Sequence, residues 1–341
     1  MGLWAAMLTF SLAACSSGES SEPVSSPDAA LADVTSASGD ASPGMDVTPD
    51  VLQEEPTDVV PGEVGLDAPS DSVTPDAPPP VETGCNGAEA LCDRRYDEVC
   101  FPTTHNSMSN ADGGWFLPNQ THGLTRQLED GIRGLMLDVH PFDGKAYLCH
   151  GVCDLGKQPL VEGLEEIADF LASHPREVVT IIFEAYVPAS DIAAGLSEAG
   201  LDALLYAHPD GTEWPTLRAL IDAGTRLVVF AESGGGEPAW YHRAWDAISD
   251  TNYAAQVPAD LVCDLNRGAL THDLFLINNF MGNPLPGIEL ATQVNFNPFL
   301  GGRAQSCAAE RDHIPNFIGV DFYKVGDLFA VVRDVNGLPP L

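Results

Sequence analysis

Two histidines carry the first chemical signal in this sequence. His105 and His150 each follow a short apolar run, and a small polar residue or a glycine comes directly after each of them. Imidazole exchanges protons near neutral pH, so two histidines in one pocket can act as general base and general acid. Asp138 and Glu184 lie near the ends of two further apolar runs, and their oxygens, with that of Asn106, suit a hard cation such as Ca²⁺. Together these residue types indicate phosphodiester cleavage.

Strand patterns would position these side chains. The run GLMLDVH at 134–140 alternates apolar residues with others, which is typical of a buried strand and puts Asp138 and His140 near its C-terminal end. The run VVTIIFEAY at 178–186 delivers Glu184 in the same way. Active sites of parallel α/β folds collect at the C-terminal ends of the strands. We therefore expect the acidic residues and the two histidines to meet in one pocket.

Strand and helix patterns alternate along the rest of the domain. Strand candidates lie at residues 97–105, 134–140, 178–186, 226–233, 274–280 and 316–323. Helical patterns lie at residues 123–131, 159–175, 190–200, 215–224 and 327–337. This order predicts an α/β fold with a mainly parallel sheet. Six strands fall short of the eight in a closed barrel, so one or two strands are missed or the barrel is irregular. Residues 238–266 are the least regular, and we interpret them as a long strand-to-helix connection.

The N-terminus has the character of an export signal. Residues 1–15 form an apolar run that ends in LAAC, as in a bacterial lipoprotein signal peptide in which Cys15 becomes the lipidated N-terminus. The run lacks the basic residues expected before the apolar core. A short buried helix is a weaker interpretation, and a membrane span would need about 20 apolar residues. The sequence favours an exported protein that is lipid-anchored to the outer membrane or cell surface, with secretion as the alternative.

Residues 16–84 differ sharply in composition from the rest of the chain. They contain no Lys, Arg or aromatic residue, and they are dominated by Ser, Asp, Glu, Pro, Val and Ala. Such a segment cannot bury enough apolar surface to offset its ordering entropy, so we expect a disordered acidic tether. Residues 85–341 would then form a single domain.

Charge excludes some classes of partner. The net charge of −35 includes 15 acidic residues between positions 19 and 82, which leaves −20 for the remainder. Nucleic acids and anionic lipid surfaces attract basic patches, so neither is an expected electrostatic partner. An acidic domain that acts on a phosphate needs a positive charge from elsewhere, and a bound divalent cation is the simplest source. We expect a monomer that meets a phospholipid substrate at a membrane surface.

Several motifs in one order resemble a known family. THNSM at 104–108, GIRGLMLDV at 131–139 and LCHG at 148–151 resemble the X-region of phosphatidylinositol-specific phospholipase C. The wider run over residues 85–337 is most similar to the secreted PLC-like phosphodiesterases of plants and fungi. The resemblance implies a distorted TIM barrel. It also implies attack of the inositol 2-hydroxyl on phosphorus, which releases diacylglycerol and a cyclic inositol phosphate.

The resemblance also assigns catalytic roles. His105 would act as the base or donate to the phosphoryl oxygen, His150 would be the general acid, and Asp321 would orient the imidazole of His105. A structural role is the alternative for each residue alone. For Asp321, a capping or core position is nearly as well supported.

A calcium site is implied by similarity to the eukaryotic enzymes. Asn106, Asp138 and Glu184 match ligands of the calcium-dependent type, whereas Met136 stands where that pattern has a glutamate. Three oxygen ligands could still hold the ion, although weakly. Alternatively, the two carboxylates only accept hydrogen bonds from the histidines or from inositol hydroxyls.

Other candidates concern the substrate. Substrate-binding candidates are Arg133, His140 and Tyr323, with Asn278 and Asn279 on position alone. For Arg133, a buried position beside a carboxylate is the preferred alternative. Trp115 and Phe116, in the loop after His105, could insert into a lipid interface or fold back onto the core.

Seven cysteines lie within the domain, and export permits disulfides. The expected pairs are Cys85 with Cys92, Cys149 with Cys153 around His150, and Cys263 with Cys307. The first two pairs rest also on the resemblance. Cys100 is left over as a buried thiol.

Two other functions compete with the phospholipase. The barrel could be a catalytically inactive surface module that binds phosphoinositides or glycans, as Met136 and the acidic surface suggest. A zinc hydrolase that uses His105, His140 and His150 is disfavoured, because the sequence lacks the HExxH-like spacing of such sites and Asn is a poor zinc ligand.

Overall fold

The computed structural model describes residues 84–282 and 285–340, which belong to one compact unit. The predicted signal peptide, the lipidation site Cys15 and almost all of the predicted tether lie outside the described residues. In the described part of the chain, no helix combines the length and the apolar character needed to cross a membrane.

Eight parallel strands form the frame of the domain. In chain order these strands are β1 (Phe101–Thr104), β2 (Gly134–Phe142), β5 (Val179–Ala185), β6 (Leu227–Ala231), β7 (Tyr241–Arg243), β8 (Ile248–Asp250), β9 (Leu274–Asn279) and β10 (Phe317–Val320). Their order in the sheet is β7-β6-β5-β2-β1-β10-β9-β8, so the last strand pairs with the first as in a barrel. Among the described residues, the one pair of successive strands without a ladder is β7 and β8. The fold is therefore an α/β barrel with an open seam.

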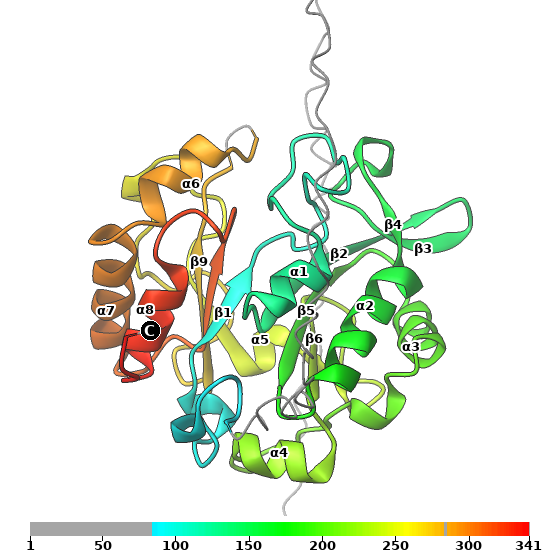
Figure 1. Ribbon diagram of the computed structural model, residues 1–341, viewed down its shortest axis with the longest axis horizontal. Helices are drawn as coiled ribbons and strands as arrows, with labels where there is room; N and C mark the ends of the chain where they lie inside the picture. Colours follow the sequence, from blue (N-terminus) through cyan, green and yellow to red (C-terminus); the bar gives the residue numbers. More distant parts are fainter. Residues whose placement is uncertain (1–83, 283–284, 341) are drawn as a thin grey trace, which may run out of the picture. The chain divides into compact units, whose positions relative to one another are not determined.

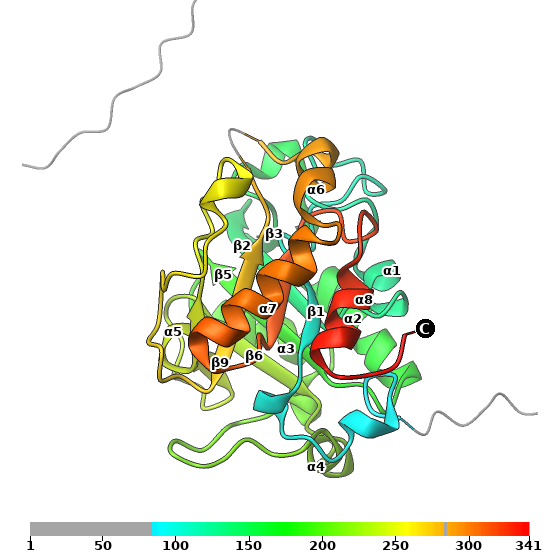
Figure 2. The same ribbon diagram turned by 90° about the vertical axis from the view of Figure 1, so that its left-hand side faces the viewer.

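Helices cover the outside of the barrel. They are α1 (Leu124–Glu129), α2 (Leu160–Ser173), α3 (Ala189–Glu198), α4 (Leu217–Ala223), α5 (Ala244–Ala247), α6 (Ile288–Val294), α7 (Phe299–Arg311) and α8 (Leu328–Val335). Helices α2 and α3 lie on one flank of the barrel, and α7 and α8 on the opposite flank (Figure 1). A small hairpin of β3 (Lys145–Leu148) and β4 (Gln158–Pro159) extends β2. The turned view shows α7 lying across β9 and β10 (Figure 2).

Alternation along the strands builds two apolar layers. On β2, Leu135, Leu137 and Val139 pack outward into the cluster shared with the helices. Met136, between them, faces the barrel interior and belongs to a second cluster. That inner cluster also holds apolar residues of the neighbouring strands and is closed by Tyr96. Since parallel strands are covered on both faces, their near-continuous apolar runs are expected.

The two strands absent from the sequence prediction are the short ones beside the seam. β7 and β8 have three residues each and are joined by the four-residue helix α5. A three-residue strand is too short to show alternation, which explains why residues 238–266 were interpreted as a connection. That interpretation is wrong for residues 241–250, which complete the eight strands of the barrel.

All three expected disulfides are present: Cys85–Cys92, Cys149–Cys153 and Cys263–Cys307. Cys100 is a free, buried thiol. Burial raises the pKa of this thiol well above its usual range, so Cys100 is an inert core residue.

Candidate active site

Polar side chains gather where the parallel strands end. Asp138 on β2 is the direct neighbour of Glu184 on β5 in the strand register. Glu232 follows β6, and its backbone N–H donates to Phe183 O on β5 at 2.9 Å. Three carboxylates therefore stand side by side at the C-terminal ends of adjacent strands. His105 follows β1 in the same rim.

The turn after β1 is fixed by hydrogen bonds. Ser107 Oγ donates to Thr104 O at 2.8 Å and accepts from Met136 N at 3.1 Å. Gln120 Nε2 donates to His105 O at 2.8 Å. Asn106, inside this turn, has a φ of 44°, the left-handed region that asparagine tolerates better than most residues. The THNS sequence thus presents the side chains of His105 and Asn106 at the end of the strand.

His105 is held by an acid and by an aromatic ring. Its Nδ1 lies 2.8 Å from Asp321 Oδ1, and Asp321 is almost fully buried after β10. Asn119 Nδ2 donates to the same oxygen at 3.1 Å. The imidazole stacks on Phe280 with ring centroids 3.6 Å apart. A carboxylate on Nδ1 fixes the ring orientation and leaves Nε2 for chemistry.

His150 lies in a short loop between the two cysteines of the Cys149–Cys153 disulfide. The N–H of Cys149 donates to Asp138 O at 3.2 Å, which ties this loop to β2. The pKa of His150 is lowered because the ring is partly withdrawn from water and because the charge of His105 opposes its own. A negative charge bound beside the ring would act in the opposite direction and favour the protonated imidazole.

The amide of Asn106 lies between the two imidazoles and Asp138. Its oxygen lies 3.3 Å from His105 Nε2 and 3.2 Å from His150 Nε2 when its nitrogen donates to both oxygens of Asp138. In the reversed orientation the amide oxygen faces the carboxylate instead. Two oxygens in contact repel each other unless a cation or a proton lies between them, so the orientation that donates to Asp138 is the one that satisfies both atoms of the amide. Both histidines therefore converge on one side chain.

The carboxylates of the rim influence one another. Burial raises the pKa of Asp138 well above its ordinary value, and the charges of Glu184 and Glu232 raise it further. Burial also raises the pKa of Glu232 to about 6, although Arg267 acts in the opposite direction. A cation placed among these oxygens would remove their repulsion.

A cavity of about 210 Å³ opens beside the histidine pair. Its walls are His105, Asn106, Met136, Leu137, Asp138, Ile182, Glu184, Glu232, Tyr253, Arg267 and Phe280. Six of these residues were not predicted from the sequence to line the site: Leu137, Ile182, Glu232, Tyr253, Arg267 and Phe280. Glu232 was the one with a usable signal, since it ends an apolar run in the same way as Glu184.

His150 faces a second, smaller pocket. This pocket of about 110 Å³ is mainly apolar, and it is lined by Ser109, Trp115, Phe116, Leu117, His150, Leu155, Gly156, Leu285 and Pro286. Trp115 is half-buried and Phe116 is exposed, so one ring packs inward and the other faces outward. The site therefore has a polar side at His105 and an apolar side at His150.

Two proposed substrate-binding residues do not reach the cavity. Arg133 precedes β2 at the opposite end of the barrel, pairs with Glu177, and lies over the ring of Phe170. Tyr323 is buried, and its hydroxyl donates to Asp130 Oδ2 at 2.7 Å. We therefore correct the substrate-binding assignment for Arg133 and Tyr323, because all their polar contacts are structural.

Three further substrate-binding candidates also lie outside the walls of the cavity. His140 stacks on the exposed ring of Tyr186 with centroids 4.3 Å apart, outside the walls of the cavity. Asn278 and Asn279 are fully buried and donate to Asp250 and to Val294 O, so both belong to the core.

No three side chains of His, Cys, Asp or Glu within residues 84–282 and 285–340 are grouped closely enough to hold a metal ion. This geometry gives no support to a zinc site built from His105, His140 and His150. A calcium site would need the amide oxygen of Asn106 beside Asp138 and Glu184, with water or substrate completing the coordination. The oxygen donors suit that ion.

The open α/β barrel has the fold of the phosphatidylinositol-specific phospholipases C, and the family is also recognisable in the sequence. Residues 91–336 match the PI-PLC X 1 family, and the chain belongs to this family. An uncharacterized secreted protein of Arthroderma benhamiae is 29% identical over 288 residues, 76% of this chain and 64% of its own length. A PI-PLC X domain-containing protein of Arabidopsis thaliana is 28% identical over 269 residues, 71% of this chain and 62% of its own. The chain thus spans less than two thirds of these two relatives.

Solved structures support the fold. The phosphatidylinositol-specific phospholipase C of Listeria monocytogenes aligns with a TM-score of 0.51 at 15% identity, covering 73% of this chain and 96% of that one. A mutant of the Staphylococcus aureus enzyme gives a TM-score of 0.51 at 14% identity, covering 73% and 95%. The predicted α/β fold of the TIM-barrel type is confirmed, with the open seam as its distortion.

Proposed function

We propose that the protein is a phosphodiesterase of the phosphatidylinositol-specific phospholipase C type. One observation carries the proposal: the two imidazoles meet at Asn106, with a polar cavity on the side of His105 and an apolar pocket on the side of His150. A lipid phosphodiester has the same division, since a polar head group lies on one side of phosphorus and an acyl-bearing alcohol on the other. The cavity would hold the head group and the apolar pocket the start of the lipid.

The proton transfers follow from the contacts of the histidines. His105, with Nδ1–H directed to Asp321, would accept at Nε2 the proton of the head-group hydroxyl beside the phosphate. As this oxygen forms its bond to phosphorus, the bond from phosphorus to the glycerol oxygen breaks. His150 would protonate that leaving oxygen. The products are a cyclic phosphate and diacylglycerol, and no water is consumed.

Calcium would be held by Asn106, Asp138 and Glu184. When bound, the ion supplies the positive charge that the phosphoryl oxygens need in an acidic cavity. Met136 lines the same cavity and offers no charged oxygen, so the site has one carboxylate fewer than the eukaryotic pattern. We expect weak binding, and Met136→Glu should tighten it.

Exposed apolar side chains favour a lipid surface as the place of action. Among the described residues, the exposed large apolar side chains are Phe116, Val152, Leu155, Tyr186, Tyr253, Val257, Val262, Leu265, Leu270, Leu285, Ile288 and Phe296. Several of them lie in segments that come directly after the C-terminal ends of strands, among them Phe116 after β1, Tyr186 after β5 and Tyr253 after β8. Such an apolar rim around a site suits insertion into a membrane interface. Three disulfides and a secreted relative favour export, and lipid anchoring at Cys15 is part of this proposal.

Activity on vesicles tests the proposal. His105→Ala and His150→Ala should each lower the release of cyclic inositol phosphate by about 10²–10⁴-fold, the usual contribution of a general acid or base. His313→Ala, at the opposite end of the barrel, is the matched control and should retain activity. EGTA should lower the rate and added Ca²⁺ should restore it. Full activity in both site variants would overturn the assignment.

An inactive binding module remains the second candidate, and Met136 favours it. In that case vesicles or Ca²⁺ would bind, yet no product would form from any phospholipid under any metal condition. Product analysis across a panel of phospholipids separates the two functions.

A further inference from the structure

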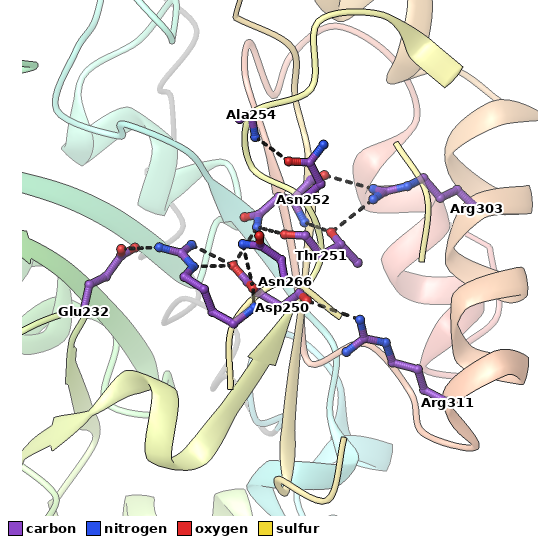
Figure 3. Close-up of polar contacts among 10 residues, drawn as sticks. Glu232, Asp250, Thr251, Asn252, Ala254, Asn266, Arg303 and Arg311 are labelled. Atoms are coloured by element: carbon purple, nitrogen blue, oxygen red, sulfur yellow. Dashed lines mark hydrogen bonds and ion pairs between the residues drawn. The ribbon is translucent and has the colours of Figure 1, made fainter. Parts of the chain in front are cut away.

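Glu232 and Arg267 line the central cavity but take no part in the proposed proton transfers. Arg267 donates from Nη1 to Glu232 Oε2 at 2.6 Å. Its Nε and Nη2 both donate to Asp250 Oδ2, at 2.9 and 2.7 Å. The guanidinium also lies over the rings of Trp245 and Tyr253, at 3.8 and 4.3 Å from the centroids. The pair is therefore fixed in orientation; Figure 3 shows Glu232 and Asp250, the two acidic residues that hold the guanidinium.

This pair offers both a donor and an acceptor to a ligand. A guanidinium has five N–H groups, and three of those of Arg267 are used in these bonds. Two N–H groups have no partner among the described residues, and the side chain is 24% exposed. Glu232 accepts the hydrogen bond of Arg267 with Oε2, so its Oε1 can accept a hydrogen bond from a ligand. A hydroxyl group both donates and accepts, and it fits such a pair.

Charge around the cavity opposes a second phosphate. The charged walls are Asp138, Glu184 and Glu232 against the single guanidinium of Arg267, and Asp250 behind it neutralises that group further. A cation beside Asp138 and Glu184 would offset those two charges only. The Glu232–Arg267 pair would still present no surplus positive charge. A phosphate on the head group would meet a carboxylate whose guanidinium partner is already shared with Asp250.

We propose that Glu232, held in place by Arg267, determines specificity by selecting a polyol head group without further phosphates. The inference rests on the proposed function, since it concerns the head group of the same substrate. The ligand class is an unphosphorylated polyhydroxyl ring joined to the lipid through one phosphodiester. Glu232 accepts a hydrogen bond from a ring hydroxyl and repels a phosphate at that position.

Turnover on vesicles gives the first test. Phosphatidylinositol and phosphatidylinositol 4-phosphate are compared at equal mole fraction in phosphatidylcholine vesicles, with the full chain. The wild type should show a kcat/KM at least about tenfold higher for the unphosphorylated lipid, because like charges in a desolvated site cost more than 1.4 kcal/mol. Glu232→Gln keeps the shape and an oxygen for Arg267, and it should reduce the ratio by about tenfold. Asp169→Asn, on the exposed face of α2, should leave the ratio unchanged.

Equilibrium binding separates this inference from the proposed function. Glycerophosphoinositol and glycerophosphoinositol 4-phosphate are titrated into the wild type and Glu232→Gln, with and without Ca²⁺, and tryptophan fluorescence is followed. If no lipid is cleaved, the phospholipase proposal fails, but a preference for the unphosphorylated compound that is lost in Glu232→Gln still supports the inference. Equal affinity for both compounds, no binding of either, or an unchanged ratio in the variant overturns it.

Discussion

Two parts of the barrel are stabilised in different ways. The regular arc, which we define as strands β1, β2, β5 and β6, has largely buried strands of four to nine residues. On β5, the first five residues, Val179 to Phe183, are all buried. The seam segment, residues 238–267, has two three-residue strands with no ladder between them among the described residues. Side-chain hydrogen bonds connect this segment to its neighbours (Figure 3).

The polar network of the seam segment is built around buried arginines and an acid. Arg303 on α7 donates to Leu261 O, Asn278 O and Asn279 Oδ1, and also to Thr251 Oγ1. Asp250, fully buried on β8, accepts from the side chain and backbone of Arg267. The comparison teaches that one barrel can be closed by apolar packing on one side and by directed bonds on the other. The directed bonds also place Arg267 in the cavity.

The largest loss of unfolding free energy is expected from Asp250→Asn. The substitution removes the buried charge on which Nε and Nη2 of Arg267 converge and leaves Glu232 as the remaining acidic partner. Breaking a buried ion pair costs about 3–5 kcal/mol of unfolding free energy. Urea unfolding followed by circular dichroism measures this loss. Asp169→Asn, exposed on α2, is the control and should stay within about 0.5 kcal/mol of the wild type. An equal loss in both variants would mean that the seam segment does not depend on this network.

The two structural disulfides outside the active site should differ in how much they contribute to the unfolding free energy. Cys263–Cys307 spans 44 residues and ties the seam segment to α7, whereas Cys85–Cys92 spans 7. On loop-closure entropy, replacing both cysteines of the longer pair with Ala should cost about 4 kcal/mol, against about 2 kcal/mol for the shorter pair. Denaturant titrations of the two double variants provide the comparison. The reverse order would show that the seam segment is constrained without its disulfide.

The regular arc is the part that could be predicted from the sequence. Its strands β2, β5 and β6 each carry four or more apolar residues, and Asp138 and Glu184 were placed by the runs that they end. The resemblance of the motifs supplied His105, His150 and Asp321, which the structure brings to one rim. Local pattern and motif therefore sufficed where each residue's position depends on its own strand.

The seam segment could not be predicted because its order depends on distant partners. Arg303 bonds to Thr251 across 52 positions, and no local pattern links them. Arg267 enters the cavity only because Asp250 and Glu232 hold it there. For the same reason Tyr323 was misassigned: its position after β10 suggested the cavity, but Asp130 draws its hydroxyl away.

The pH should change the unfolding free energy by a smaller amount, through Glu232 beside the seam segment. The folded-state pKa of Glu232 is about 6, above its ordinary 4.5, mainly because of burial. The folded protein therefore binds this proton more tightly than the unfolded chain, and unfolding free energy falls as pH rises from about 4.5 to 6. The difference corresponds to roughly 2 kcal/mol. Unfolding in EGTA at several pH values should show this decline for the wild type, and Glu232→Gln should lose it. Parallel curves for both proteins would contradict the expectation.

The smallest loss of unfolding free energy is expected at α4, which comes between β5 and β6 of the regular arc along the chain. Thr216 caps this helix, since its Oγ1 accepts from Ala219 N at 3.1 Å. Thr216→Ala should cost about 1 kcal/mol, and Thr216→Ser, which keeps the oxygen, should cost less. The double variant with Asp250→Asn tests the comparison itself. If the arc and the seam segment are independent, the two losses add within about 0.5 kcal/mol, because residues that share no partner rarely couple. A larger deviation in urea unfolding would mean that the polar network also supports the apolar arc.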